Sequence, residues 1–270
     1  MRKKITNAIV ICLISSCSYK SISTPERQKT AVAGSGFYKQ AFPFKWQERD
    51  SFVTKEILAG NIPSFLKRFV PIHVQVKDSA TGKTIKAIYY VAPDYLSVGS
   101  DNDWARINIT PMAAQKIADS LHCFLPTRKM VDDIYKTAKI KLEPLPLYAL
   151  RDSTPTMYHH HLMIEGQRKG RKGLIAGIKK DVVISAKITM DNKPDRVAIY
   201  GWHKMDGKPI QPLYTGHINW WVDYSQGIRL VYQKIKLGGQ WMDYKDVLKN
   251  SVLKKLLCDE EYCDFYKYPY

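Results

Sequence analysis

The sequence predicts an α+β fold in a single domain, with helices in the middle of the chain and mainly antiparallel sheet in the later part. Capped amphipathic segments between residues 110 and 170 indicate the helices. From residue 181 onward, β-branched and aromatic runs separated by turn residues indicate the strands. The body, residues 37–270, is long enough to bury one core, and no linker-like stretch divides it.

Five segments have the apolar spacing of amphipathic helices. The clearest begins at Thr110 and Pro111, a typical cap and first-turn proline, and places Ala113, Ile117 and Leu121 on one face. Two further segments begin in the same way, at Thr127 and at Thr154–Pro155. The five predicted helices are 46–68, 110–123, 126–140, 153–170 and 244–257.

Two glycine-containing turns and several β-rich runs predict the strands. "SATG" is predicted to turn a hairpin over residues 73–92, and "GG" to turn a second one over 234–242. The remaining runs are "VVISAKI", "RVAIYGW" and "IRLVYQKIKL".

The first residues have the marks of a secretory signal. Arg2, Lys3 and Lys4 are followed by the apolar run "AIVICLI", which is shorter than the roughly 20 residues of a membrane-spanning helix. The sequence "ISSC" that ends this run resembles the lipobox of bacterial lipoproteins. The resemblance implies a signal peptide over residues 1–16 and lipidation of Cys17 in the cell envelope, whereas a plain secreted protein is the alternative. Residues 17–36 are small and polar, and we expect them to form a flexible tether.

The chain is strongly basic. It carries 42 basic and 25 acidic residues, and removal of residues 1–16 leaves 39 basic residues and a net charge of +14. The basic residues are dispersed, and no nucleic-acid-binding signature accompanies them. In an exported protein such a charge indicates attraction to lipid phosphates, acidic glycans or cell-wall polymers rather than to nucleic acid.

Three cysteines remain in the body. Cys258 and Cys263 can close a small ring, with Cys123 as a buried small hydrophobe, or Cys123 can pair with one of them. A catalytic cysteine is not expected, because no base or helix start lies near Cys123.

Three consecutive histidines at 159–161 do not form a metal site by themselves. Successive helical residues point about 100° apart, so the three rings cannot face one ion. His161 and Glu165 share a helix face, and we expect them to contact substrate or to belong to a polar helix surface. No third ligand has a suitable spacing, so no metal is predicted.

Two neighbouring stretches, "YGWHKMDGKPIQPL" and "YTGHINWWVDYSQGIRLV", concentrate reactive side chains. Strand ends and the loops beyond them are where site residues gather. Here two histidines can act as bases, Ser225 as a nucleophile, and an arginine as an oxyanion partner. An aromatic-rich sheet core is the alternative. The predicted catalytic residues are His203, His217, Asp223, Tyr224, Ser225 and Arg229, all lining one cleft, and Trp202, Trp220 and Trp221 are predicted to stack on sugar rings.

Residues 225–231, "SQGIRLV", resemble the S-H-G-C-x-R motif of L,D-transpeptidases (YkuD-like domains), which a histidine such as His217 precedes. The likeness covers about fifteen residues. Gln226 stands at the histidine position and the cysteine nucleophile is missing, so cysteine-dependent transpeptidation is not predicted. Over most of residues 85–250 the chain also resembles an uncharacterised family of secreted bacterial proteins.

These observations predict an envelope-anchored lipoprotein hydrolase of cell-wall or other extracellular polymer. His217 would be the base, and Ser225 or an activated water the nucleophile. Two alternatives stay open. One is a non-catalytic lipoprotein that binds glycan or anionic polymer. The other is a polysaccharide lyase in which Tyr224 and a histidine exchange a proton beside a carboxylate neutralised by Arg229. No cofactor is predicted, and the predicted partners are the polymer and, through the N-terminal lipid, the membrane.

Overall fold

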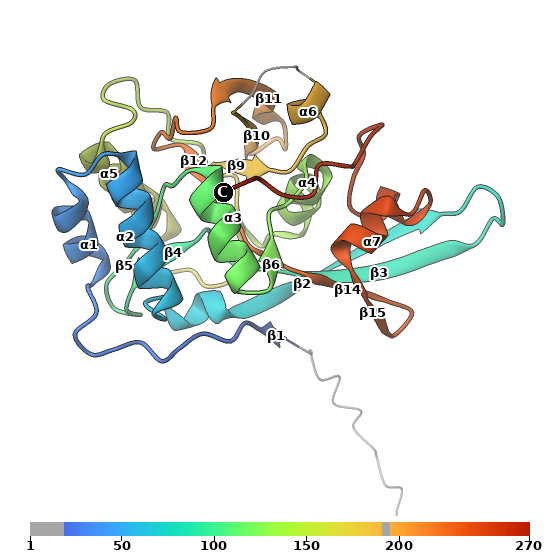
Figure 1. The fold of residues 1–270 in the computed structure, drawn as a ribbon, viewed down its shortest axis with the longest axis horizontal. Helices are drawn as coiled ribbons and strands as arrows, with labels where there is room; N and C mark the ends of the chain where they lie inside the picture. The colour runs from blue at the N-terminus through green and yellow to red at the C-terminus, as the bar shows by residue number, and fades with distance from the viewer. Residues whose placement is uncertain (1–18, 191–194) are drawn as a thin grey trace, which may run out of the picture.

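Two mainly antiparallel sheets organise the structure, a computed structural model that describes residues 19–190 and 195–270. The larger sheet includes a long hairpin that projects from one end of the molecule (Figure 1). Its strands are β1 (Lys20–Ser21), β2 (Arg68–Lys77), β3 (Thr84–Val91), β6 (Cys123–Phe124), β13 (Val231–Tyr232), β14 (Lys234–Leu237) and β15 (Gln240–Asp243).

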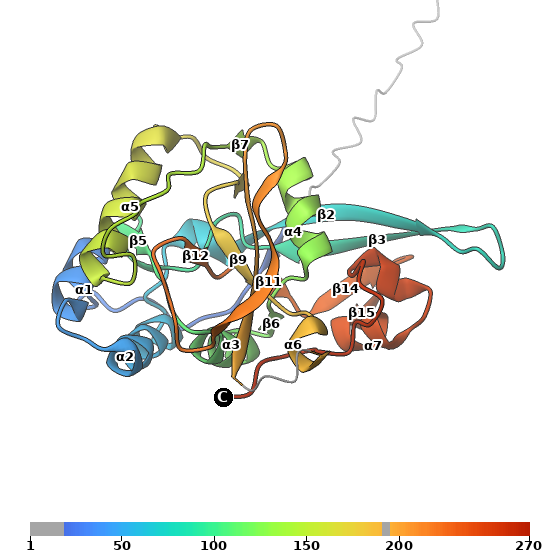
Figure 2. The same ribbon diagram turned by 90° about the horizontal axis from the view of Figure 1, so that it is seen from above.

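The smaller sheet has the order β11-β10-β9-β12, in which only β9 and β12 run parallel. Figure 2 shows its long hairpin in front when the molecule is seen from above. The strands are β9 (Lys180–Val183), β10 (Arg196–His203), β11 (Pro209–Ile218) and β12 (Gln226–Gly227). Two short pairs complete the strands, β4 (Ser97–Gly99) with β5 (Trp104–Arg106), and β7 (Ile140–Lys141) with β8 (Ile175–Ala176).

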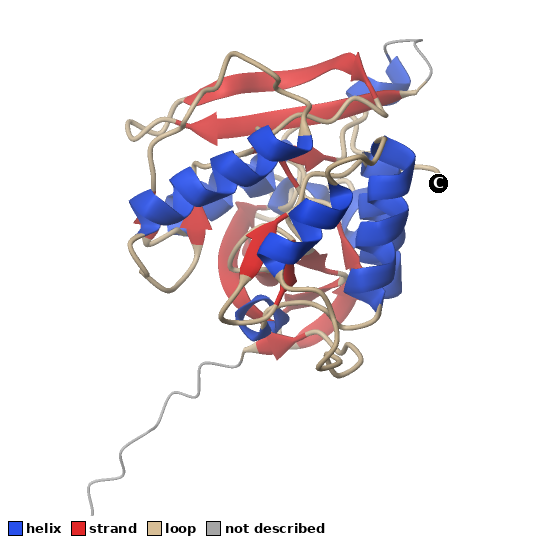
Figure 3. Ribbon diagram, turned by 90° about the vertical axis from the view of Figure 1, so that its left-hand side faces the viewer, coloured by secondary structure: helices blue, strands red, loops and turns tan. Residues whose placement is uncertain are grey.

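The helices fill the space beneath and beside the small sheet (Figure 3). One of them, α4, contacts both β2 of the large sheet and β10 of the small one, so a single core connects the two sheets. The helices are α1 (Gly34–Ala41), α2 (Trp46–Leu58), α3 (Pro111–Ser120), α4 (Arg128–Thr137), α5 (Thr154–Arg168), α6 (Lys187–Met190) and α7 (Tyr244–Lys249), with 3₁₀ turns η1 (Ser64–Lys67) and η2 (Leu253–Leu256).

Side-chain caps start the three central helices. Thr110 Oγ1 accepts from the Ala113 amide, and Thr127 Oγ1 accepts from the Met130 amide. The third helix begins one residue earlier than predicted, because Ser153 supplies its cap. These bonds satisfy amides that have no partner within the helix, which confirms the predicted α+β architecture at its clearest elements.

The tether prediction is wrong for the residues that the structure describes. β1 pairs with β2, Ile22 is buried, and Arg27 donates to Asn61 at 2.7 Å. Helix α1 then begins at Gly34. Small polar residues resemble a linker in sequence, yet their backbone groups here pair with a strand edge. Residues 1–16 and Cys17 lie outside the described residues.

Three predicted elements are interrupted. The segment 46–68 is a helix only to Leu58, and a 3₁₀ turn replaces the rest. The run 228–237 is divided between β13 and β14, and 244–257 between α7 and η2. In each case apolar residues of the segment still pack in the core, but a turn interrupts the regular backbone hydrogen bonds of the helix or strand.

Cys258 and Cys263 form a disulfide, and Cys123 is a buried free thiol, which confirms the first of the two predicted pairings. Burial raises the pKa of the Cys123 thiol and so disfavours the thiolate form. Among the described residues, no helix combines the length and apolar character needed to cross a membrane.

Candidate functional site

A buried segment, residues 223–227, borders the candidate site and leads into β12. The buried Asn108 amide donates to the carbonyls of Asp223, Tyr224 and Gln226 at 3.1, 3.1 and 2.6 Å. From the other side, the Lys179 ammonium donates to the Tyr224 carbonyl. Because backbone carbonyls of a buried loop must find donors, these two side chains hold the loop in one conformation.

Gly227 allows the loop to lie this close to its supports. A Cβ at this position would lie 2.5 Å from the Tyr95 ring and 2.9 Å from Lys179 Cβ. The glycine is therefore required by packing rather than by backbone angle.

Asp223 is held by the loop and by an arginine from the preceding segment. One carboxylate oxygen accepts from the Ser225 amide at 2.8 Å and from Ser225 Oγ at 2.6 Å. The other accepts from Arg151 at 2.8 Å. Ser225 is fully buried and its proton points at Asp223, so it is a turn-stabilising residue, and its predicted role as nucleophile is wrong.

Lys180 lies at the centre of a cationic and aromatic cluster, which we call the Lys180 site and define by Lys180, Arg151, Trp202, His217, Trp221, Asp223 and Gln226. On β9, Lys180 pairs with Gln226 of β12 on one side and with Gly201 of β10 on the other. Its ammonium lies 5.3 Å from the centre of the Trp202 ring. The residue is only 7% exposed, so most of its side chain is buried beside this ring.

A distortion in β10 brings Trp202 to this position. Gly201 and Trp202 both have positive φ, 105° and 57°, and the pairing with β11 shifts register just before them. A bulky residue in the left-handed region is strained, and such strain is concentrated at functional sites. The bulge re-aims the side chains that follow it, so Trp202 packs beside Lys180 while His203 points to α4.

Two buried polar atoms at the site have no hydrogen-bond partner among the described residues. They are Trp202 Nε1, a donor, and Gln226 Oε1, an acceptor. Both side chains are at most 4% exposed. An unpaired buried polar group costs about 1–3 kcal/mol, and an internal water would satisfy these two atoms.

His217 lies at the open end of the site. It is half-buried, and its ring contacts Tyr214 and Trp221 at 5.1 and 6.4 Å between centroids. Burial lowers the pKa of His217, Asp223 opposes this shift, and the charge of Lys180 adds to it. Burial also lowers the pKa of Lys180, with Asp223 again opposing. These groups are thus close enough to influence one another, and the lowered pKa of His217 favours the neutral imidazole.

The structure brings together part of the predicted site. Around Lys180 it gathers Trp202, His217, Trp221, Asp223 and Tyr224. The Tyr224 hydroxyl, however, is bonded to the backbone of Leu147, so it is not free to exchange a proton. Trp220 is 45% exposed and lies next to the site in the turn after β11.

His203 lies elsewhere, so the prediction of a single cleft is wrong. The β10 partner of His217 is Val197, six residues before His203, which corresponds to about 20 Å of strand. His203 Nε2 bonds to Asp132 at 2.9 Å, and its ring stacks on Tyr135. A separate cavity of about 360 Å³ adjoins it. Despite its bulge, β10 places its two ends far apart. The alternation of residues in the sequence tells which face of a strand a side chain is on, but not how far it lies from another one on that face.

Arg229 is a structural residue, contrary to prediction. It is 1% exposed, donates to the carbonyls of Ala92 and Ile175, and lies 3.7 Å from Asp181. Its guanidinium nitrogens contact these buried protein groups, so the side chain is not placed to neutralise a substrate carboxylate.

His161 and Glu165 also differ from prediction. Both contact the fully buried Arg106, Glu165 through a 2.8 Å ion pair and His161 through Nδ1 at 3.3 Å. Asp94 completes this buried network with an ion pair of 2.7 Å to Arg106. Burial and the charge of Arg106 lower the pKa of His161 well below its usual range, so it is a neutral core residue.

Sequence reasoning missed Lys180, Arg151, Gln226 and Asn108. A signal was present for Lys180: "KKD" begins a β-rich run, and a lysine inside a buried strand has to be paired or used. Asn108 and Arg151 lie in loops that gave no signal, because only the fold brings them to residue 223.

Among residues 19–190 and 195–270, no cluster of three or more His, Cys, Asp or Glu side chains is arranged to hold a metal ion. The chain matches no protein-family model, and neither the curated proteins nor the solved structures include one to which it is significantly similar.

Proposed function

We propose that this chain is an exported lipoprotein, anchored at Cys17, whose body binds an acidic extracellular polysaccharide at the Lys180 site. The observation that carries the proposal is Lys180, a strand lysine that is 7% exposed and whose ammonium lies 5.3 Å from the centre of the Trp202 ring. A cation is rarely buried without a counter-ion. A ligand carboxylate would provide one.

The charge balance of the site supports an anionic ligand. Asp223 is already paired with Arg151 and bonded to Ser225. With His217 neutral, Lys180 is left as the net positive charge. A single carboxylate would therefore neutralise the site.

The other groups suit a sugar ring. The half-buried Trp221 and the exposed Trp220 offer apolar faces of the kind on which sugars stack. The basic net charge would draw an anionic polymer to the surface.

Isothermal titration against a polymer panel tests the proposal. The panel contains a polyuronate, a neutral glucan, peptidoglycan and single-stranded DNA. We expect the polyuronate to bind, and Lys180→Met, which keeps the side-chain length, to weaken binding at least ten-fold. Lys208→Met, at the exposed β10–β11 turn, is the matched control. Equal loss in both variants, or preferential binding of DNA, would contradict the proposal.

The anchor is tested separately. Replacing Cys17 with Ala should release the protein from the membrane fraction and abolish incorporation of labelled palmitate. A variant that stays in the membrane fraction would show that the lipobox-like sequence is not used.

A second candidate function is hydrolysis of the bound polymer by a water that His217 activates. It is favoured by the lowered pKa of His217, because a neutral imidazole can accept a proton. Mass spectrometry of the incubated polymer would detect new chain ends, and His217→Ala should abolish them while binding remains. An unchanged polymer would leave binding alone as the function.

A further inference from the structure

The large sheet has one face directed outward, next to the start of the described chain. Its other face packs into the core, where Ile72, Ala87 and Tyr89 are buried and the Tyr89 hydroxyl bonds to Met130 of α4. Because side chains alternate along a strand, the intervening residues share the opposite face. We call this the outer face.

The outer face is basic. It carries Lys77 on β2, Lys86 on β3, and Lys234 and Lys236 on β14. Among these strand residues the acidic side chain on the same face is Asp243. Its carboxylate lies 3.2 Å from the Lys234 ammonium, with which it forms an ion pair. The face therefore has an excess of positive charge that the strands do not neutralise.

Aromatic side chains lie beside these lysines, close to the N-terminus. The Lys20 ammonium lies 4.5 Å from the Tyr232 ring and 5.6 Å from the Trp241 ring. Trp241 is 47% exposed and Tyr19 is 62% exposed. Half-exposed tryptophan and tyrosine beside lysine are typical of surfaces that contact lipid headgroups.

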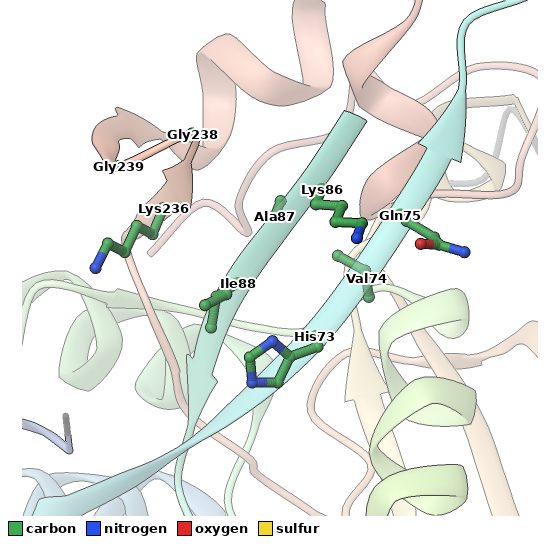
Figure 4. A pocket seen from close by; sticks show the side chains of 9 residues that line it. All are labelled: His73, Val74, Gln75, Lys86, Ala87, Ile88, Lys236, Gly238 and Gly239. Atoms are coloured by element: carbon green, nitrogen blue, oxygen red, sulfur yellow. The ribbon is translucent and has the colours of Figure 1, made fainter. Parts of the chain in front are cut away.

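A hollow of about 500 Å³ opens on this face (Figure 4). Strands β2 and β3 contribute His73, Gln75, Lys86 and Ile88, and β14 contributes Lys236 beside the Gly238–Gly239 turn. Lysines on two sides of a partly apolar hollow suit a phosphate group with its attached hydrocarbon.

We propose that the outer face docks on an anionic lipid bilayer and that the hollow receives a lipid phosphate headgroup. The inference rests on the proposed lipidation of Cys17. Two peptide units separate Cys17 from Tyr19, so covalent geometry keeps the two Cα atoms within about 8 Å. Because β1 is fixed to β2, no long tether separates the body from the membrane.

This docking sets the orientation of the Lys180 site. In Figure 1, β1 lies at the lower side of the molecule and β9, β10 and β12 at the upper side. Figure 3, turned about the vertical axis, keeps the hairpin of β10 and β11 at the top. The strands that carry the Lys180 site would thus lie on the side of the molecule away from the bilayer.

A fluorescent reporter tests the orientation. Lipidated full chain carrying Gln75→Cys or Tyr148→Cys is labelled with nitrobenzoxadiazole and reconstituted into vesicles of phosphatidylglycerol and phosphatidylcholine. Gln75 lies on the outer face, whereas Tyr148 is 89% exposed in the loop before α5. Cys123 is buried and Cys258 is disulfide-bonded, so the introduced thiol is the one labelled.

We expect a blue shift and a several-fold rise in emission at position 75 and none at position 148. Charge reversal by Lys86→Glu with Lys236→Glu should abolish the signal, since each lysine near an anionic surface is worth about five-fold in partition. Lys172→Glu with Lys208→Glu, at exposed positions away from the outer face, is the matched control.

The outcomes separate this inference from the anchor. If the protein floats with the vesicles but position 75 gives no shift, or both positions shift equally, the docking is wrong and the anchor stands. If the wild type does not float with vesicles at all, the anchor and the docking are both wrong.

Discussion

Replacing Asn108 with Ala tests whether the loop that carries the Lys180 site is held from below. The amide has two hydrogens and bonds to three loop carbonyls, while its Oδ1 has no partner among the described residues. Only donor bonds are therefore lost. Two such bonds contribute about 1 kcal/mol each, and leaving buried carbonyls unpaired adds a further 1–2 kcal/mol.

We thus expect a loss of about 3–4 kcal/mol from a typical total of about 5–15. For a domain of this size, 1 kcal/mol corresponds to about 2–4 °C, so the melting temperature should fall by about 6–16 °C. Polyuronate binding should weaken as well, because Asp223 and Gln226 lose their fixed positions.

Thermal melts by circular dichroism and titration calorimetry measure the two effects. Asn102→Ala, at an exposed asparagine, is the control and should shift the melt by no more than about 1–2 °C. If Asn108→Ala melts within that range, the three bonds do not hold the loop, and the description of the site as preorganised fails.

Three other substitutions separate structural from functional residues. Ser225→Ala should cost about 1 kcal/mol and leave any polymer cleavage intact, because its hydroxyl serves Asp223; complete loss of cleavage would restore it as a nucleophile. His217→Ala should lose any polymer cleavage, keep polymer binding and melt within a few degrees of wild type, since the ring is half-buried. Ile228→Asp should unfold the protein, because a buried carboxylate without a partner costs several kcal/mol; a folded variant would be contrary evidence. Burial lowers the pKa of Lys179 to about 7 from 10.5, so the unfolded state binds one more proton between these values. Stability should then rise with pH across this window, by up to about 1.4 kcal/mol per pH unit, and Lys179→Met should flatten the rise in urea titrations.

The clearest helices were predictable because their signals are local. Thr110 and Thr127 cap helices through bonds to residues three positions along the chain. Apolar residues at helical spacing then share a face whatever the helix packs against. The hairpin of β2 and β3 follows similarly from alternation and a turn of four residues.

The site was only partly predictable because its contacts are distant in sequence. Asn108 meets residues 223–226, and Arg151 meets Asp223, through loops whose paths depend on the whole fold. The sequence predicted a site in the stretch around residues 217–226, part of which borders Lys180, and it assigned chemistry to Ser225 and Arg229 beside His217. Both have reactive groups, and burial gives them structural roles instead.

His203 and His217 show the same division within one hairpin. The sequence alone predicts the strand that leads to His203. It also shows that the stretch after this strand, which contains His217, is rich in aromatic residues. Their separation of about 20 Å depends on the pairing of β10 with β11. Lys180 becomes the centre of the site only because β9 lies between β10 and β12, where Trp202 and Gln226 meet it. Local patterns thus determine which segments are helix and strand, whereas burial and charge at each side chain depend on neighbours that only tertiary packing supplies.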